Sequence, residues 1–316
     1  MSAPLLQTIG LKKYFKTGKG TLHAVDDVNF TIEKGKTLGV VGESGCGKTT
    51  LGRSILRLTE PTEGQILFNG EDVTHVSGKK MHEFRKNAQI IFQDPSSSLN
   101  PRMSVGQLIA EPIRVMKTIS GNKAIDERVF ELMNIVGLDE RFYVSYPHEL
   151  DGGRRQRIGV ARALALDPQF IVCDEPVSAL DVSIQAQILN LLMDLQDTMG
   201  LTYMFITHDL SVVKHISDDI AVMYLGQCIE KAPTDELFEK PLHPYTQALL
   251  AAIPVPNLKN RSIESTIKGE ISSPIDPKPG CRFATRCPFA KPECTGKELE
   301  LKEVSPGHFV KCVMFQ

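Results

Sequence analysis

The sequence has no long apolar run, no excess of charge of one sign and no secretion signal at its start. None of its hydrophobic stretches approaches the ~18 residues that a membrane-spanning helix requires. Its 36 basic and 38 acidic residues give a formal net charge of −2, whereas nucleic-acid-binding proteins usually carry a basic excess or a basic face. The first residues, MSAPLLQTIGLKKYFK, lack the charged and then apolar layout of a signal peptide. We therefore expect a soluble, cytoplasmic protein with no nucleic-acid partner.

Internal repeats and low-complexity tracts are also missing, and 316 residues are enough for one large domain with a small appendage. Short apolar segments alternate with amphipathic ones. Strands are expected at 36–41, 169–174, 201–207 and 219–225, and helices at 48–58, 182–200 and 209–217. This alternation predicts a mainly parallel α/β sheet that is covered on both faces. Apolar residues at three- and four-residue spacing predict a helical insertion at about residues 100–166.

The stretch GESGCGKTT, residues 42–50, follows one expected strand and opens one expected helix. It matches the Walker A pattern G-x-x-x-x-G-K-[ST] in the context that this pattern requires. The backbone N–H groups of such a loop surround phosphates, its lysine reaches the β- and γ-phosphates, and its hydroxyl binds Mg²⁺. The expected nucleotide-binding residues are Gly42, Glu43, Ser44, Gly45, Cys46, Gly47, Lys48, Thr49 and Thr50, with Lys48 also catalytic and Thr49 on the metal.

Polar residues stand at the ends of three other expected strands. FIVCDE ends in Asp174, which is expected to hold Mg²⁺, and Glu175, which is expected to polarise the attacking water. His208, in FITHDL, is expected to reach the γ-phosphate. The amide of Gln93, in IIFQDP, is expected to sense both Mg²⁺ and the attacking water. Together with Lys48, these residues form the predicted catalytic set.

Four of the seven cysteines lie in the tail: Cys281, Cys287, Cys294 and Cys312. In a cytosolic protein such a cluster more often holds a metal than forms disulfides. The C-x2–4-C pairs of structural zinc sites are missing, and the wider spacing favours a [4Fe–4S] cluster, with zinc or unliganded thiols as alternatives. An extension of about 40 residues would need such a staple to fold. Prolines recur from 253 to 280 and predict an extended linker before it.

The stretch ELDGGRRQR, residues 149–157, resembles the start of a helix that binds phosphate through its N–H groups. Asp151, however, puts a carboxylate just before Gly152 and Gly153. An aspartate caps a helix about as well as a serine does, so we expect the helix to form. A carboxylate ~5 Å from one phosphate charge is nevertheless repelled by roughly 3 kcal/mol at an effective dielectric constant near 20.

Taken together, these motifs resemble the nucleotide-binding subunit of ABC transporters over roughly residues 5–250. The motifs are the Walker A loop, Gln93, LDGGRRQR (150–157), FIVCDE (170–175), SALD (178–181) and His208. FQDPSSSLNPRMSVGQLIAEP (92–112) and HPYTQALL (243–250) are similar to oligopeptide/dipeptide importer ATPases. The resemblance implies an α/β P-loop NTPase core with an ABC-type helical subdomain, at 1–252, and a small cysteine-rich extension after the linker, at 253–316. Importer ATPases of this kind carry a [4Fe–4S] cluster in that place.

The resemblance also implies how the site works. Adenine would stack on Phe15 or its neighbour Tyr14. Gly152 and Gly153, beside Asp151, would bind the γ-phosphate of ATP on a second subunit, and Asp181 would communicate across the dimer interface. Hydrolysis of ATP would power the uptake of di- or oligopeptides at the cytoplasmic face of the membrane. The expected partners are a second ABC ATPase subunit in a heterodimer, two permease subunits and an extracytoplasmic peptide-binding protein, and residues from Gln93 towards Pro112 would meet the permease.

Two questions stay open at the level of sequence. The signature of the family reads L-S-G-G-Q, so Asp151 and Arg154 depart from it. We expect functional asymmetry between the two ATP sites, with restoration of ordinary function by Arg154 as the alternative. The alternatives for function are an ABC importer ATPase for another small solute such as nickel complexes, a soluble ABC ATPase outside transport, and a regulatory module that does not hydrolyse ATP. The chain lacks the long coiled-coil insertion or second ATPase domain of soluble ABC ATPases, and Glu175 and His208 argue against a regulatory module.

Overall fold

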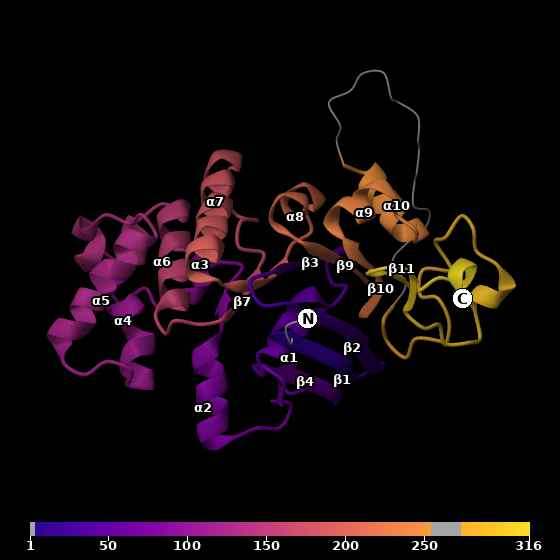
Figure 1. Ribbon diagram of the computed structural model, residues 1–316, viewed down its shortest axis with the longest axis horizontal. Helices are drawn as coiled ribbons and strands as arrows, with labels where there is room; N and C mark the ends of the chain where they lie inside the picture. Colours follow the sequence, from indigo (N-terminus) through magenta and orange to yellow (C-terminus); the bar gives the residue numbers. More distant parts are fainter. Residues whose placement is uncertain (1–3, 254–272) are drawn as a thin grey trace, which may run out of the picture. The chain divides into compact units, whose positions relative to one another are not determined.

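The computed structural model describes residues 4–253 and 273–316, which fall into two units (Figure 1). The first unit is formed by Met1–Ile32, Thr37–Thr74 and Thr207–Gln316, and the second by Glu33–Lys36 and His75–Ile206. The predicted domain boundary at residue 252 stays a prediction. Most of the predicted proline-rich linker, residues 254–272, lies outside the described residues.

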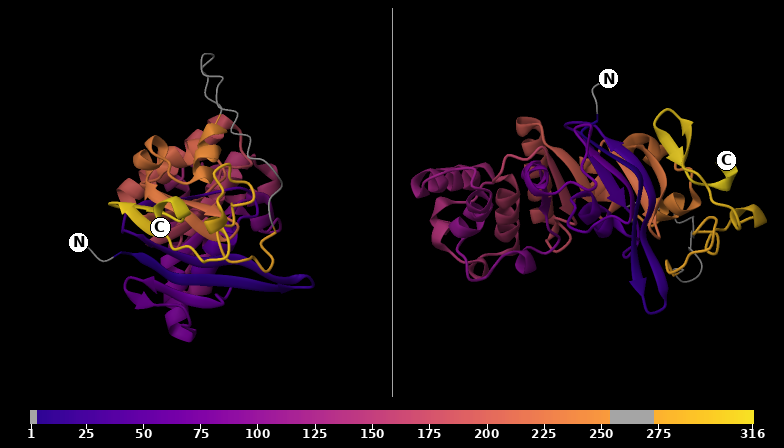
Figure 2. Two further views of the ribbon diagram at one scale, coloured as in Figure 1. Left: turned by 90° about the vertical axis from the view of Figure 1, so that its right-hand side faces the viewer. Right: turned by 90° about the horizontal axis from the view of Figure 1, so that it is seen from below.

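The first unit contains an antiparallel sheet in the order β2-β1-β4-β5. Its strands are β1 (Leu6–Thr17), β2 (Gly20–Ile32), β4 (Glu63–Phe68) and β5 (Glu71–Asp72). β1 and β2 form a long ribbon, which both views of Figure 2 show in indigo. The sequence pattern does not reveal these strands, because register shifts at Leu11 and Lys13 interrupt the alternation of buried and exposed side chains along β1.

A second set of strands in the first unit has the order β11-β12-β10-β9-β3. The parallel pair β3 (Thr37–Val41) and β9 (Asp219–Tyr224) confirms two of the predicted strands. The antiparallel members are β10 (Gln227–Pro233), β11 (Lys302–Ser305) and β12 (His308–Val310). The helices are α1 (Lys48–Ile55), α8 (Leu210–Ile216), α9 (Thr234–Glu239), α10 (Pro244–Ala251), η3 (Pro292–Cys294) and η4 (Val313–Phe315).

The second unit has three parallel strands in the order β8-β7-β6. They are β6 (Ala88–Ile91), β7 (Phe170–Asp174) and β8 (Thr202–Ile206), and every residue of β7 and β8 is buried. The predicted helical insertion is confirmed, since α4, α5 and α6 pack on one another within it. The helices are α2 (Gly78–Asn87), α3 (Pro95–Ser98), α4 (Val105–Met116), α5 (Asn122–Ile135), η1 (Glu140–Val144), η2 (Pro147–Glu149), α6 (Gly152–Leu164) and α7 (Val182–Met199).

Within residues 4–253 and 273–316, no helix has both the length and the apolar character that crossing a membrane requires.

Residues 273–316, here called the C-terminal segment, pack on the rest of the first unit along two edges. At one edge the backbone N–H of His23 donates to Pro274 O (3.0 Å), and that of Asp276 donates to Thr21 O (2.9 Å), so the segment runs along β2. At the other edge β12 pairs with β10. Between them, Phe283 is 1% exposed and joins a core cluster with residues of β9 and α10. Ordinary packing therefore holds this segment.

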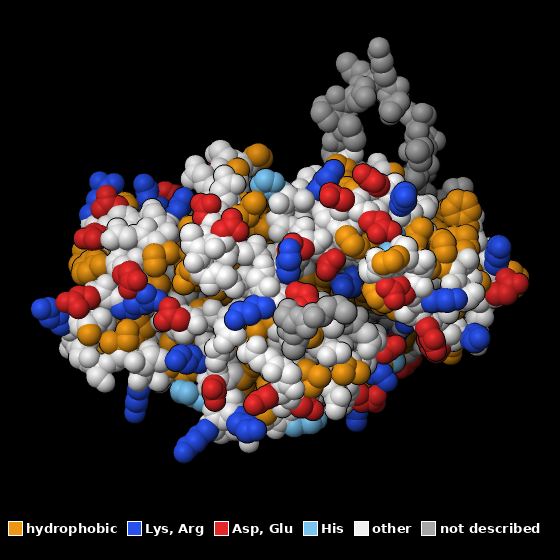
Figure 3. Space-filling model, in the orientation of Figure 1, with side chains coloured by type: hydrophobic (Ala, Val, Ile, Leu, Met, Phe, Trp, Pro, Cys, Tyr) orange, Lys and Arg blue, Asp and Glu red, His pale blue; other side chains and the backbone are white. Residues whose placement is uncertain are grey.

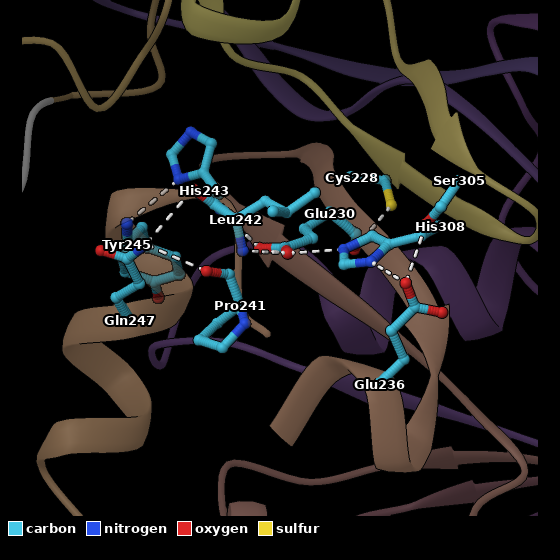
Figure 4. Close-up of polar contacts among 10 residues, drawn as sticks. All are labelled: Cys228, Glu230, Glu236, Pro241, Leu242, His243, Tyr245, Gln247, Ser305 and His308. Carbon is cyan, nitrogen blue, oxygen red and sulfur yellow. Dashed lines mark hydrogen bonds and ion pairs between the residues drawn. The ribbon is translucent and has the colours of Figure 1, made fainter. Parts of the chain in front are cut away.

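A buried charge network also fastens the segment (Figure 4). His308 of β12 is 1% exposed, and its Nε2 lies 2.9 Å from Oε1 of Glu230, which is fully buried in β10. Its Nδ1 lies 3.1 Å from Oε1 of Glu236 in α9, and that oxygen also accepts a hydrogen bond of 2.8 Å from Ser305 Oγ. One imidazole thus joins two carboxylates from two different elements.

The same network sets the charge of His308. Burial by itself lowers the pKa of His308, but the hydrogen bonds and charges of Glu230 and Glu236 outweigh burial and raise it. The folded protein therefore holds this proton at pH values where an unfolded histidine has lost it. The resulting stability is fully present below the unfolded pKa of 6.5 and is lost as the pH rises through the raised folded pKa.

We predict that His308→Ala lowers the free energy of unfolding by about 3–5 kcal/mol near pH 6, because Glu230 is left buried without its cation. The loss should shrink near pH 9, where wild-type His308 is itself nearer to neutral. Denaturant unfolding at both pH values measures this. His82→Ala, at an exposed position of α2, is the control and should change the free energy by less than about 0.5 kcal/mol. An equal loss at both pH values would contradict the charge-based explanation.

Candidate functional site

The loop between β3 and α1 requires glycine for steric reasons. Gly42 and Gly47 have φ values of 150° and 105°, which side chains rarely allow. A Cβ at Gly42 would lie 2.2 Å from Met223 O, and one at Gly47 would lie 2.0 Å from Ala24 O. The loop backbone therefore lies directly against β2 and the end of β9. This explains the predicted glycine positions, and α1 begins directly after the loop with no side chain capping its N-terminus.

Lys48, the first residue of α1, folds back over this loop. Its Nζ donates hydrogen bonds to Gly42 O (2.8 Å) and Glu43 O (3.1 Å), and the residue is 5% exposed. No acidic residue lies in the first turn of α1. The loop thus combines a helix N-terminus with a fixed ammonium group, and an arrangement of this kind favours the phosphates of a nucleotide. Thr49 follows in the same turn, and its role as a metal-binding hydroxyl stays a prediction.

The two aromatic candidates for adenine have different surroundings. The ring of Tyr14 stacks on His23 at a centroid distance of 3.9 Å, and its hydroxyl donates to Asp26. Phe15 is 37% exposed, with Lys13 Nζ 4.8 Å from its ring centroid. Because Tyr14 is stacked on another ring and only partly exposed, the exposed Phe15 is the better placed of the two to offer a ring to a base.

His208 lies in the first unit, directly after Thr207, whose backbone is hydrogen-bonded to β3. The N–H of Thr207 donates to Val40 O at 3.1 Å, two residues before Gly42. His208 itself is exposed, and Asp209 caps α8 by accepting from the N–H of Ser211 (2.8 Å). The structure therefore places His208 at the same strand end as the phosphate loop.

In the second unit the structure brings Gln93 and Glu175 together. The parallel pairing of β6 with β7 aligns Ile91 with Cys173, so the residues that follow each strand meet at one edge. Gln93 Nε2 donates to Glu175 Oε2 at 2.8 Å. This contact orients the carboxylate that the sequence assigns to water activation. Asp174, the last residue of β7, is 2% exposed beside it.

Glu175 has an unusual backbone. Its φ is 46°, a left-handed conformation that non-glycine residues adopt at a cost. Its N–H donates to Ile206 O at 2.9 Å, and the carbonyl of Glu175 accepts from the N–H of Ser178 (3.3 Å). These hydrogen bonds hold the conformation in place. Such strain is frequent where a side chain must point in a set direction for function.

Asp151 is the N-cap of α6, as predicted. Its Oδ1 accepts from the N–H of Arg154 at 2.8 Å, and its Oδ2 accepts from Arg154 Nη1 at 2.5 Å. Gly152 and Gly153 begin the helix, and a Cβ at Gly153 would lie 2.8 Å from Ile184 Cγ2 of α7. The carboxylate thus has a cation beside it, and the glycines allow α6 and α7 to lie close together.

Asp181 caps α7 in the same way. Its Oδ1 accepts from the N–H of Ile184 (3.0 Å) and from Ser183 Oγ (2.7 Å). The hydrogen bond from Ile184 is the main cause that lowers the pKa of Asp181. Asp181 therefore has a local structural task in this chain, and its role across a dimer interface stays a prediction.

The prediction of a [4Fe–4S] cluster, or of zinc, in the tail is wrong. Among the residues that the structure describes, no group of three or more His, Cys, Asp or Glu side chains could hold a metal ion. The four tail cysteines line one cavity of about 20 Å³, which has room for about one water molecule and is too small for a four-iron cluster. Burial raises the pKa of Cys281 to about 11 and also raises that of Cys287 and Cys312, so these side chains are neutral thiols.

Sequence reasoning also missed the residues that surround the phosphate loop. The N–H of Glu43 donates to the hydroxyl of Tyr245 at 2.9 Å, and the carboxylate of Glu43 binds Arg286. Tyr245 belongs to HPYTQALL, which was notable only for its resemblance, and Arg286 stands among the tail cysteines. No local pattern links either residue to a loop about 200 positions away.

A phosphate loop between a buried strand and a helix defines the P-loop ATPases. The resemblance to the ABC class of these proteins implied a glycine turn at the start of a helix, and α6 begins with such a turn. A family model described as ABC transporter matches residues 25–178, and one described as oligopeptide/dipeptide transporter, C-terminal region, matches residues 229–294. The chain belongs to the ABC transporter ATPases of the oligopeptide/dipeptide family. Its mixed α/β P-loop fold is theirs, and ATP with Mg²⁺ is the ligand of this class.

Individual relatives agree along nearly the whole chain. The putative oligopeptide transport ATP-binding protein YkfD of Bacillus subtilis (strain 168) is 51% identical over 316 residues, covering 99% of this chain and 96% of that protein. OppF of the same strain, named as an oligopeptide transport ATP-binding protein, is 52% identical over 313 residues, covering 99% and 97%. A dimeric, post-hydrolysis structure of the ATP-binding cassette MJ0796 bound to ADP and Pi has a TM-score of 0.67 and 27% identity, covering 72% and 98%.

We predict that alkylation of Cys46 blocks nucleotide binding, because its Sγ lies 3.9 Å from Lys48 Nζ inside the phosphate loop. Burial raises the pKa of this thiol, so the reaction should be slow at neutral pH and faster at alkaline pH. Fluorescent ATP binding after treatment with N-ethylmaleimide measures the effect, and bound ATP should protect. Cys46→Ala is the control, since it should bind ATP with or without treatment. Full ATP affinity of a protein alkylated at Cys46 would contradict the prediction.

Proposed function

We propose that this chain is the ATP-hydrolysing subunit of a membrane importer for di- or oligopeptides. The contact between Gln93 and Glu175 carries the hydrolytic part of the proposal, because it gives a strand-end carboxylate a set orientation. The full-length likeness to relatives named as oligopeptide transport ATP-binding proteins supports the peptide substrate.

In the first unit, the residues from Gly42 to Thr50 bind the phosphates in this proposal. Lys48 neutralises the β- and γ-phosphates, and Thr49 binds Mg²⁺. Phe15 stacks on adenine, and His208 contacts the γ-phosphate. The fold of Lys48 over the carbonyls of the loop supports its part, since phosphate oxygens can replace those carbonyls as acceptors.

In the second unit, Glu175 acts as the general base that takes a proton from water. Gln93 orients Glu175 and the water, and Gln93 and Asp174 are the ligands that this unit would offer to Mg²⁺. The burial of Asp174 at the end of β7 supports its part, because a buried carboxylate is stable when a cation or hydrogen bonds compensate it.

The proposed partners are proteins: a second ABC ATPase, two permease subunits and an extracytoplasmic peptide-binding protein. In this assembly Asp151, Gly152 and Gly153 face ATP on the second ATPase, and Asp181 lies near the same interface. The chain acts at the cytoplasmic face of the membrane, on the permease, as a peripheral subunit. Basic and acidic side chains are interspersed over the face in Figure 3, a pattern that suits protein contacts better than nucleic acid.

We expect Glu175→Gln to lower ATP turnover at this chain's own phosphate loop in the assembled transporter by about 10²–10⁴-fold while ATP binding is retained, because an amide cannot accept the proton from water. Phosphate release and the uptake of a labelled dipeptide measure the two effects. Glu127→Gln, on the exposed face of α5, is the control and should leave both unchanged. Undiminished turnover in Glu175→Gln would refute the proposed mechanism. Uptake of a nickel complex in place of peptides would refute only the proposed substrate.

A further prediction concerns asymmetry in the proposed heterodimer. In a Glu175→Gln background, the remaining turnover comes from the site that Asp151 completes on the partner's ATP. Asp151→Ser should then raise that turnover several-fold, because it removes a repulsion of roughly 3 kcal/mol that Arg154 only partly offsets. The ion pair of Asp151 and Arg154 supports the alternative, in which Arg154 restores ordinary function. Unchanged turnover in Asp151→Ser would support that alternative. A fall in turnover in the single variant Arg154→Gln would show how much the cation contributes.

A further inference from the structure

The phosphate loop carries an acidic side chain of its own. Glu43 directly follows Gly42, and its carbonyl oxygen accepts a hydrogen bond from Lys48 Nζ at 3.1 Å. A carboxylate within a loop that binds a polyanion opposes binding through charge repulsion. Something in the fold must therefore compensate Glu43 if this loop is to hold ATP.

Arg286 of the C-terminal segment supplies that compensation. Its Nη1 lies 2.9 Å from Glu43 Oε2, and its Nη2 lies 3.0 Å from Glu43 Oε1, a two-point pairing of guanidinium and carboxylate. The side chains of Arg286 and Glu43 are 7% and 23% exposed, so water screens the pair only weakly. The hydrogen bond to Glu43 is also the main cause that raises the pKa of Arg286.

Aromatic side chains hold Arg286 in this place. Its Nη1 donates to the hydroxyl of Tyr224 at 3.2 Å, and its guanidinium carbon lies 5.9 Å from the ring of Phe283. Tyr224 and Tyr245 contact Phe283 with ring centroids 5.4 Å away in both cases. Tyr245 in turn accepts the hydrogen bond from the N–H of Glu43. The carboxylate and the backbone of Glu43 are thus both fixed, one by the C-terminal segment and one by α10.

A second arginine of the segment has a parallel contact. Arg282 donates to the carboxylate of Asp26 on β2 and to the carbonyl of Leu225. Asp26 accepts from the hydroxyl of Tyr14, next to the proposed adenine-stacking Phe15. Two arginines of the same segment therefore pair with acidic side chains of the first unit, one on β2 and one in the phosphate loop.

We propose that Arg286 is a positioning residue of the ATP site. It neutralises Glu43 and holds the phosphate loop in place, so the C-terminal segment contributes to nucleotide binding. The inference rests on the proposed function, since it requires ATP on this loop. Arg286 does not touch the reacting atoms. It acts through Glu43, whose carbonyl meets Lys48.

The test is a double-mutant cycle in the full chain, with MANT-ATP and MANT-ADP titrations. Arg286→Leu should weaken ATP binding about tenfold or more, because it leaves Glu43 uncompensated. The affinity for ADP should fall less, since ADP carries less charge. High salt should narrow the difference in ATP affinity between Arg286→Leu and wild type. Glu43→Gln should bind ATP as well as wild type does or more tightly. The double variant Glu43→Gln/Arg286→Leu should recover most of the lost affinity.

The controls separate shielding of charge from simple support of the fold. Arg57→Leu removes another buried arginine of the first unit, one that pairs with Glu60, and it should keep ATP affinity even where it lowers the melting temperature. Arg286→Lys keeps the charge without the two-point pairing and should bind ATP with intermediate affinity, which tests the proposal if Arg286→Leu does not fold. A double variant as weak as Arg286→Leu, or equal losses for ATP and ADP, would overturn the proposal. If wild type and Lys48→Ala bind ATP equally poorly, the proposed function fails instead.

Discussion

The close approach of the phosphate loop to its neighbours is the constraint on which the candidate site depends. No side chain fits at Gly42 or Gly47, because carbonyl oxygens of Met223 and Ala24 occupy the space. The loop is therefore shaped by β2 and β9 as much as by its own residues, and this shape brings Lys48 back over the loop carbonyls. Anything that moves those strands would also move the groups that meet phosphate.

The C-terminal segment shows how a small extension can be held without a metal. Phe283 enters the core, β12 extends the sheet beside β10, and His308 is held between two carboxylates. These interactions take the place of the bound metal that a short cysteine-rich extension was expected to need. Arginines of the same segment reach the phosphate loop and β2, so that the segment is continuous with the candidate site.

Local and distant interactions differ in how far the sequence predicts them. The cap at Asp151 and the strand that ends in Asp174 are confirmed, because each depends on residues within a few positions. The long strands β1 and β2 are not evident from the sequence, since their irregular register disrupts the period of two. The meeting of Gln93 with Glu175 follows from parallel strand pairing, which the alternating pattern predicted only in outline.

The sequence by itself determined the phosphate loop, the helix cap at Asp151 and the order of the core strands and helices, because glycine torsions, short-range hydrogen bonds and apolar spacing depend on neighbouring residues. Only the tertiary structure decided which charges meet. Glu43 and Arg286 are 243 positions apart, and Glu230 and His308 are 78 apart. It also decided that the tail cysteines surround a cavity too small for a cluster. Pairings of this kind depend on the path of the whole chain, and no local pattern records that path.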